Sequence, residues 1–233
     1  MKKLFTALRQ GDMETVIALL DKKPELIACT AKAPPKKDAG QSPLQVAIKS
    51  GNPAIAHLLL DRGADVNFME AEDCGSDWRM PAVHDGIRAA VMCTRWNARW
   101  PDGYHVSHTP EQADQAFALL DRMVNMDADL TAKDSGGLSA LDRALLDAKQ
   151  ILPAFHYGEQ SYMEDRLLTP ELESDLNRIF RLLLEASPNM TQHIIAPDSK
   201  ETLAMQFLLS NGGLRYQAHR YDESNRKWVP VQE

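Results

Sequence analysis

Residues 40–67 read GQSPLQVAIKSGNPAIAHLLLDRGADVN, and this stretch decides the fold. It contains two short segments whose apolar residues recur at helical spacing, and the first segment opens with Ser42 and Pro43. A serine hydroxyl can cap the first turn of a helix, and proline suits the first helical position. Gly51 and Gly63 follow the two segments, where glycine can adopt the left-handed conformation that closes a helix. Two helices of about ten residues cannot bury their apolar faces alone, so the unit requires neighbouring copies of itself.

The same unit resembles an ankyrin repeat at most of the positions that define that family. The matching residues are Gly40, Ser42, Pro43, Leu44, Ala47, Gly51, Leu58, Leu59, Gly63, Ala64, Asp65 and Asn67. Ser42 and Gln45 stand where the family's Thr-Pro-Leu-His run has threonine and histidine. The resemblance implies an α-solenoid of helical hairpins that binds other proteins through its finger loops and inner helices.

Five units of this kind follow one another along the chain. Each has one key position in its inner helix, and these positions are Ala7, Ala47, Gly86, Ala144 and Phe207. They are 40, 39, 58 and 63 residues apart, whereas plain ankyrin repeats are about 33 residues long. We therefore predict an all-α, ankyrin-type solenoid over residues 1–213, with elongated third and fourth hairpins and an incomplete fifth unit. Residues 214–233 alternate apolar and polar side chains, which predicts a C-terminal β-hairpin that caps the solenoid.

The extra length of the third and fourth units falls at one end of their helices. Ala90 and Ala148 stand where the first two units have the glycine that ends the inner helix. Because alanine is the best helix former, we expect the third inner helix to run to about Trp96 and the fourth to about Leu152. The outer helices of both units begin at matching Thr-Pro-Glu runs, residues 109–111 and 169–171. Their apolar pattern predicts outer helices that are about two turns longer than that of the second unit.

Aromatic residues concentrate in the two loops at the tips of these elongated hairpins, residues 97–108 and 153–168. Six rings lie in or next to these loops: Trp96, Trp100, Tyr104, Phe155, Tyr157 and Tyr162. Such side chains anchor interfaces and line ligand pockets. Alternatively, the two hairpins pack on each other and the rings form their small core. Both interpretations can hold at once.

The concave surface of the solenoid is a second candidate for binding. Arg88 and Arg95 are seven residues apart, which would place them on one face of the third inner helix. Asp77 and Trp78 lead into that helix from an acidic finger loop. These four residues could form a polar and aromatic groove for a partner. The alternative is that the acidic finger and the arginines form salt bridges within the molecule.

Composition argues against several classes of partner and location. The formal net charge of −7 disfavours general affinity for nucleic-acid phosphates or anionic membrane surfaces. No apolar run approaches the roughly 20 residues that a membrane helix needs, and charged residues interrupt the apolar start of the chain, so we expect no secretory leader. Three scattered cysteines fit reduced thiols. We therefore predict a cytoplasmic protein that binds neither nucleic acid nor membrane.

Catalytic and metal sites have weaker support in the sequence. His105 and His108 are three residues apart, with His84, Cys74 and Cys93 nearby in the chain, but the paired spacing of a structural zinc site is absent. No glycine-rich phosphate loop occurs. We predict no enzyme activity, cofactor or metal, and a module that binds or occludes another protein; the alternative is a small-ligand protein that uses the aromatic tip as a pocket. The predicted partner-binding residues are Asp77, Trp78, Arg88, Arg95, Trp96, Trp100, Tyr104 and Tyr157.

Overall fold

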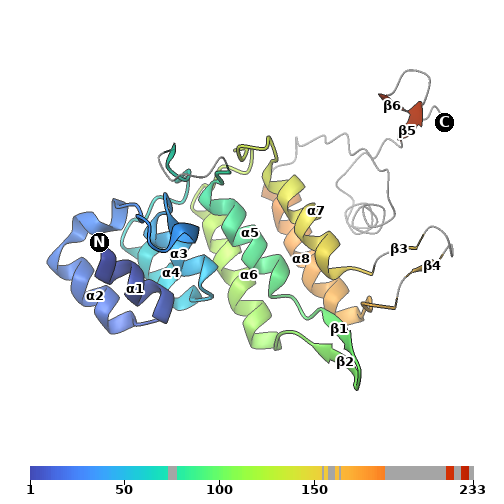
Figure 1. The fold of residues 1–233 in the computed structure, drawn as a ribbon, viewed down its shortest axis with the longest axis horizontal. Helices are drawn as coiled ribbons and strands as arrows, with labels where there is room; N and C mark the ends of the chain where they lie inside the picture. Colours follow the sequence, from blue (N-terminus) through green and yellow to red (C-terminus); the bar gives the residue numbers. More distant parts are fainter. Residues whose placement is uncertain are drawn as a thin grey trace. The chain divides into compact units, whose positions relative to one another are not determined.

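The computed structural model is a chain of helical hairpins with three short strand pairs (Figure 1). It describes residues 1–72, 78–153, 155–156, 161–162, 164–186, 219–222 and 227–230. The chain forms two compact units. The first comprises Met1–Ala90 with Asp114–Arg143, and the second comprises Val91–Ala113 with Ala144–Glu233. The all-α class predicted from the repeats is confirmed.

The first two repeats have the helices that their capping residues and glycines predict. They are α1 (Lys2–Gln10), α2 (Met13–Lys22), α3 (Pro43–Lys49) and α4 (Pro53–Asp61), with the short 3₁₀ turns η1 (Pro24–Ala28) and η2 (Lys36–Asp38) between α2 and α3. Ser42 and Gln45 form a reciprocal capping box at the start of α3. Gly11 and Gly51 have φ values of 72° and 71° after α1 and α3, the left-handed geometry that closes these helices.

The third and fourth repeats have longer helices, as predicted. The inner helices α5 (Ala82–Met92) and α7 (Ala140–Ile151) have 11 and 12 residues, against seven in α3. The outer helices α6 (Pro110–Asn125) and α8 (Pro170–Ala186) have 16 and 17 residues, against nine in α4. Thr109 and Thr169 cap the two outer helices through their hydroxyl oxygens, which accept from Gln112 and Leu172.

One predicted boundary is wrong: α5 ends at Met92, not near Trp96. The amide and the hydroxyl of Thr94 both donate to the carbonyl of Val91, at 3.2 and 2.8 Å, and this turn replaces the helical hydrogen bonds. The residues that follow form an antiparallel hairpin rather than the expected loop. Its strands are β1 (Asn97–Trp100) and β2 (Gly103–Val106).

The core consists of the apolar faces of the repeat helices. The repeat register places Leu58, Leu59 and Leu183 at outer-helix positions that face the neighbouring unit, and so predicts that all three are buried. Leu59 and Leu183 are buried, whereas Leu58 is half-buried and Leu60 is buried in its place. α5 and α6 pack closely, because a Cβ at Gly86 would lie only 2.8 Å from the sulfur of Met123.

Two further strand pairs lie in the C-terminal half of the sequence. Strands β3 (Phe155–His156) and β4 (Ser161–Tyr162) pair, and so do β5 (His219–Asp222) and β6 (Lys227–Pro230). The hairpin expected in the C-terminal tail is therefore present, and its role as a cap of the solenoid stays a prediction. The predicted fifth unit around Phe207 lies outside the described residues.

Candidate functional site

The β1–β2 hairpin is fastened along one side by the segment before α8. The amide of Arg99 donates to the carbonyl of Asp165 (3.3 Å), and Asn97 Oδ1 accepts from the amide of Leu167 (3.0 Å). The hydroxyl of Tyr104 donates to the carbonyl of Glu164 (2.8 Å). A two-stranded hairpin is only marginally stable alone, so these contacts give it a fixed support.

Arg95 fastens the base of the same hairpin to α8. Its amide, Nε and one terminal nitrogen donate to the carboxylate of Asp175 at 3.0, 2.9 and 2.9 Å. Asp175 is almost fully buried and also pairs with Arg178 at 3.2 Å. Because α5 ends before Arg95, the predicted common helix face of Arg88 and Arg95 is wrong. The observed contacts of Arg95 are those of a structural anchor.

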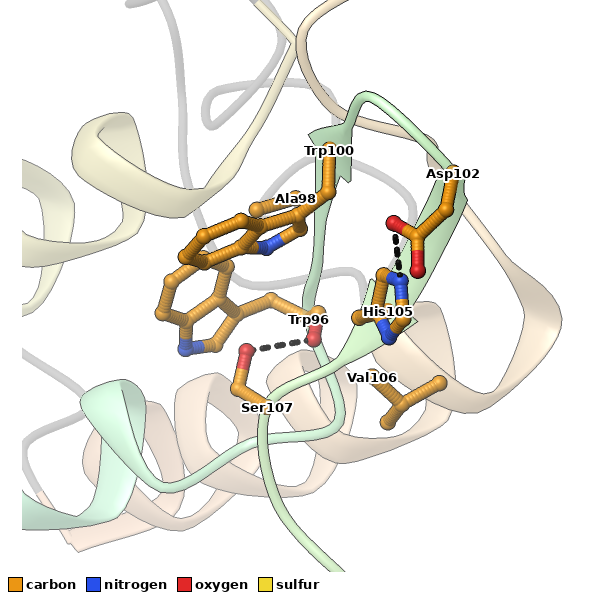
Figure 2. Close-up of a pocket in the computed structure, with 7 residues that line it drawn as sticks. All are labelled: Trp96, Ala98, Trp100, Asp102, His105, Val106 and Ser107. Atoms are coloured by element: carbon orange, nitrogen blue, oxygen red, sulfur yellow. Dashed lines mark hydrogen bonds and ion pairs between the residues drawn. The ribbon is translucent and has the colours of Figure 1, made fainter.

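The opposite face of the hairpin is open and borders a pocket of about 480 Å³ (Figure 2). Seven residues line it: Trp96, Ala98, Trp100, Asp102, His105, Val106 and Ser107. Alternation along a strand explains part of the set, because residues 96, 98 and 100 share one face of β1 and its approach, and His105 pairs with Ala98. Trp100 is 61% exposed, and its ring meets the imidazole of His105 edge-on at a centroid distance of 6.3 Å. His105 Nε2 lies 2.8 Å from Asp102 Oδ1.

Trp96 and Trp100 have different surroundings, and the choice between a partner surface and a core shared by the two tip loops stays a prediction. Trp96 is half-buried, its indole N–H donates to the carbonyl of Met92 (3.0 Å), and the guanidinium of Arg166 lies 5.1 Å from its ring centroid. Trp96 therefore belongs partly to a local core, whereas Trp100 is a surface residue. Tyr157 lies outside the described residues, as do the side chains of Phe155 and Tyr162.

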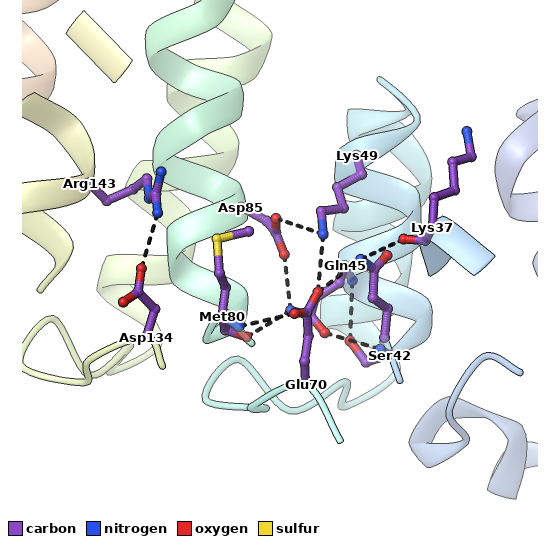
Figure 3. Close-up of polar contacts among 10 residues, drawn as sticks. Lys37, Ser42, Gln45, Lys49, Glu70, Met80, Asp85, Asp134 and Arg143 are labelled. Atoms are coloured by element: carbon purple, nitrogen blue, oxygen red, sulfur yellow. Dashed lines mark hydrogen bonds and ion pairs between the residues drawn. The ribbon is translucent and has the colours of Figure 1, made fainter. Parts of the chain in front are cut away.

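The finger residue Trp78 occupies a second, separate region, in the first unit. Its indole is 45% exposed and covers Gly136 so closely that a Cβ there would lie 2.7 Å from the ring. The guanidinium of Arg143 lies 5.9 Å from the Trp78 ring centroid and pairs with Asp134 at 3.1 Å (Figure 3). Arg88 is half-buried on α5 in the same unit, whereas Arg95 belongs to the second unit. Asp77 lies outside the described residues.

A buried polar network in the first unit was not predicted from the sequence (Figure 3). Asp85 on α5 accepts from Gln45 Nε2 at 3.0 Å and lies 3.5 Å from Lys49 Nζ, which also contacts Glu70 at 3.1 Å. Burial raises the pKa of Asp85 to about 7, against the lowering effect of Lys49 and with a further raising effect of Glu70. The feature of the sequence that could have predicted this network is Asp85 itself, a carboxylate at the inner-helix position where the second repeat has Val46.

His84 lies next to this network in the sequence and is completely buried. Burial lowers the pKa of its imidazole to about 4, so the ring is neutral near neutral pH. Within the described part of the chain, no group of three or more His, Cys, Asp or Glu side chains could hold a metal ion. Of the helices in that part, none is both long and apolar enough to span a membrane.

Comparison with known proteins identifies a family that the N-terminal part of the chain matches. Residues 2–70 match a family model described as ankyrin repeats (3 copies). No curated protein matches the sequence. Similar solved structures include the ankyrin repeat domain of Bcl-3, a member of the IkappaB protein family. Its sequence is 15% identical, the TM-score is 0.41, and the alignment covers 91% of this chain and 86% of the Bcl-3 chain. An ankyrin repeat domain from Acinetobacter baumannii is 15% identical with a TM-score of 0.36 and covers 91% of this chain and 98% of that one.

The family match agrees with the helix caps, the helix-ending glycines and the packing of the repeats described above. It covers the first unit's N-terminal repeats, where the capping box and the left-handed glycines stand at the family's positions. Ankyrin repeats are generally modules for protein–protein interaction. Residues 2–70 of the chain belong to the ankyrin-repeat family.

Proposed function

We propose that this protein is a non-catalytic module that binds a partner protein through the open face of the β1–β2 hairpin and so occludes or scaffolds that partner. The observation that carries the proposal is Trp100, an indole that is 61% exposed on a hairpin fastened at its base and along one side. Exposed tryptophans on rigid supports are typical hot-spot residues, because little conformational entropy is lost when a partner covers them.

Other exposed apolar side chains lie on or beside the hairpin. Nine large apolar side chains are exposed in the described part of the chain, and five of them lie on the hairpin or on the segment that fastens it. These five are Trp100, Tyr104, Val106, Leu167 and Leu168. Concentrations of exposed apolar side chains mark interaction sites in soluble proteins. Of these five, only Trp100 and Val106 border the open face, and these two favour a contact region for a protein partner there.

A small-molecule function has one observation in its favour, the pocket of about 480 Å³. This volume lies in the range of roughly 300–1,000 Å³ that ligand sites occupy, but such sites bury most of the ligand surface. Here two lining residues, Trp100 and Val106, are 61% and 63% exposed. A small ligand would remain largely solvated, so a protein that covers the whole face fits better.

Affinity capture from the cells that make the protein tests the proposal. We expect wild type to retain a partner that Trp100→Ala loses, with no change in the unfolding midpoint, because the Trp100 ring makes little contact with the core. Trp78→Ala is the matched control, since it removes a half-exposed indole from the other region. If capture survives Trp100→Ala and fails with Trp78→Ala, the finger region with Asp77, Trp78 and Arg88 is the binding site instead. A small molecule that co-purifies in native mass spectrometry and is lost with Trp100→Ala would favour the ligand alternative.

A further inference from the structure

The open face of the hairpin combines aromatic rings with a carboxylate. Trp96 and Trp100 project from the same side of the chain at β1, and Asp102 lies in the turn that joins the strands (Figure 2). Ala98 and Val106 supply apolar surface to the same pocket. Indole faces attract cations through their negative electrostatic potential, and a neighbouring carboxylate adds a counter-charge.

One of the two indole rings already has a cationic side chain of the same chain beside it. The guanidinium of Arg166 lies 5.1 Å from the centroid of Trp96, within the range of a cation–π contact. The ring of Trp100 meets only the edge of His105 among the described ring contacts and remains 61% exposed. The indole of Trp96 thus has a cation from the same chain beside it, whereas the indole of Trp100 is exposed and accessible to a partner.

The carboxylate at the turn is also only partly used. Asp102 Oδ1 pairs with His105 Nε2 at 2.8 Å, and within the described residues Oδ2 has no hydrogen-bond partner. The side chain is 74% exposed, so a partner can reach it. The net charge of −7 also favours encounter with a basic partner over an acidic one.

We propose that this pocket receives an arginine or lysine side chain from a basic segment of the partner. The cation lies over the ring of Trp100, Asp102 is its counter-charge, and its aliphatic stem contacts Ala98 and Val106. Arginine fits better than lysine, because a planar guanidinium can stack on an aromatic face and can form two parallel hydrogen bonds with a carboxylate. The inference rests on the proposed function, since it names the part of a partner that the hairpin holds.

Peptide titration of the full-length protein, followed by the indole N–H signals in NMR, tests this inference. The probes are a Gly-Ser peptide carrying three arginines, the same peptide with citrulline, which has nearly the same shape without the charge, and a proline-rich peptide. We expect the arginine peptide to shift the Trp100 signal and to bind about tenfold more tightly than the citrulline peptide. Asp102→Asn is expected to reduce that preference several-fold and Trp100→Ala to remove binding, whereas Glu25→Gln, which removes an exposed charge far along the chain, leaves it intact.

Several results would overturn the inference. These are equal binding of the arginine and citrulline peptides, tighter binding of the proline-rich peptide, or no shift of the Trp100 signal at millimolar arginine peptide. Its failure is distinguishable from failure of the proposed function. If affinity capture depends on Trp100 while the peptides show no preference for charge, the hairpin binds a partner through apolar contacts and only the cation assignment is wrong.

Discussion

Replacing Asp85 with asparagine is expected to remove a pH dependence of folding stability that the buried network in the first unit creates (Figure 3). The side chain of Asp85 is inaccessible to solvent, and the charged groups that face it are Lys49 on α3 and Glu70 in the following finger. A single ammonium group therefore lies near two carboxylates in a region of low solvent access. Burial outweighs the attraction of Lys49, which is why the pKa of Asp85 rises to about 7.

The sign and size of the effect follow from this pKa. In the unfolded chain Asp85 releases its proton near pH 3.8, whereas in the folded protein it retains the proton until about pH 7. The stabilising contribution of the protonated form is complete below about pH 4 and is lost as the pH rises to about 7. The loss is about 1.4 kcal/mol per pH unit within this window and on the order of 4 kcal/mol in total.

Urea unfolding of wild type and Asp85→Asn between pH 4 and pH 8 measures the effect. Because other titrating groups are common to both proteins, the difference between their free energies of unfolding isolates Asp85. We expect the asparagine variant to gain relative stability steadily up to about pH 7 and then to level off. Glu25→Gln, at an exposed acid, is expected to show no such trend, and Lys49→Met to extend the window to higher pH. A difference that stays constant from pH 4 to pH 8 would refute the reasoning.

Three further changes test the packing and the anchor of the hairpin. Leu59→Ala removes a fully buried side chain and is expected to cost roughly 2–5 kcal/mol in urea unfolding; a loss below about 1 kcal/mol would contradict the repeat register. Asp175→Asn leaves the guanidinium of Arg95 without its counter-charge and is expected to cost roughly 2–4 kcal/mol, with faster hydrogen exchange of the β1–β2 amides; unchanged exchange would show that the anchor is dispensable. Gly136→Ala introduces a Cβ 2.7 Å from the ring of Trp78, so we expect the indole to swing outward and its fluorescence to shift to the red; an unchanged spectrum would contradict the close contact.

The helix starts could be predicted from the sequence because their signals are local. The capping box of Ser42 and the caps at Thr109 and Thr169 each depend on residues within one turn. The repeat register follows from these starts and correctly predicted the burial of Leu59 and Leu183. The register did not determine which neighbour shares the core, so Leu58 was wrongly expected to be buried.

The candidate site was less predictable, because its contacts join residues far apart in the sequence. The role of Arg95 depends on Asp175, which lies 80 residues further along the chain. The pKa of Asp85 depends on Lys49 and Glu70 from another repeat and its finger. Spacing along one helix says nothing about such partners. It suggested a common helix face for Arg88 and Arg95, but Arg95 lies between the end of α5 and the start of β1. Only the exposure of Trp100 follows from a local argument, since it lies at the end of a strand beside a turn.

The end of α5 shows why alanine in place of glycine at one repeat position was a poor guide to helix length. Ala90 and Ala148 occupy the same position, yet α7 continues to Ile151 while α5 ends at Met92. The difference lies in the next residues: Lys and Gln after Ala148 are good helix formers, whereas the Cys-Thr pair that ends at Thr94 is poor and its threonine bonds back to the preceding carbonyl. Once the helix ends there, the alternating Trp-Asn-Ala-Arg-Trp run and the Pro-Asp-Gly that follows favour a hairpin, since Asp-Gly between alternating segments is a strong turn signal. The sequence thus contained the evidence for the strands, and it is the hairpin rather than a longer helix that brings the aromatic rings onto one open face.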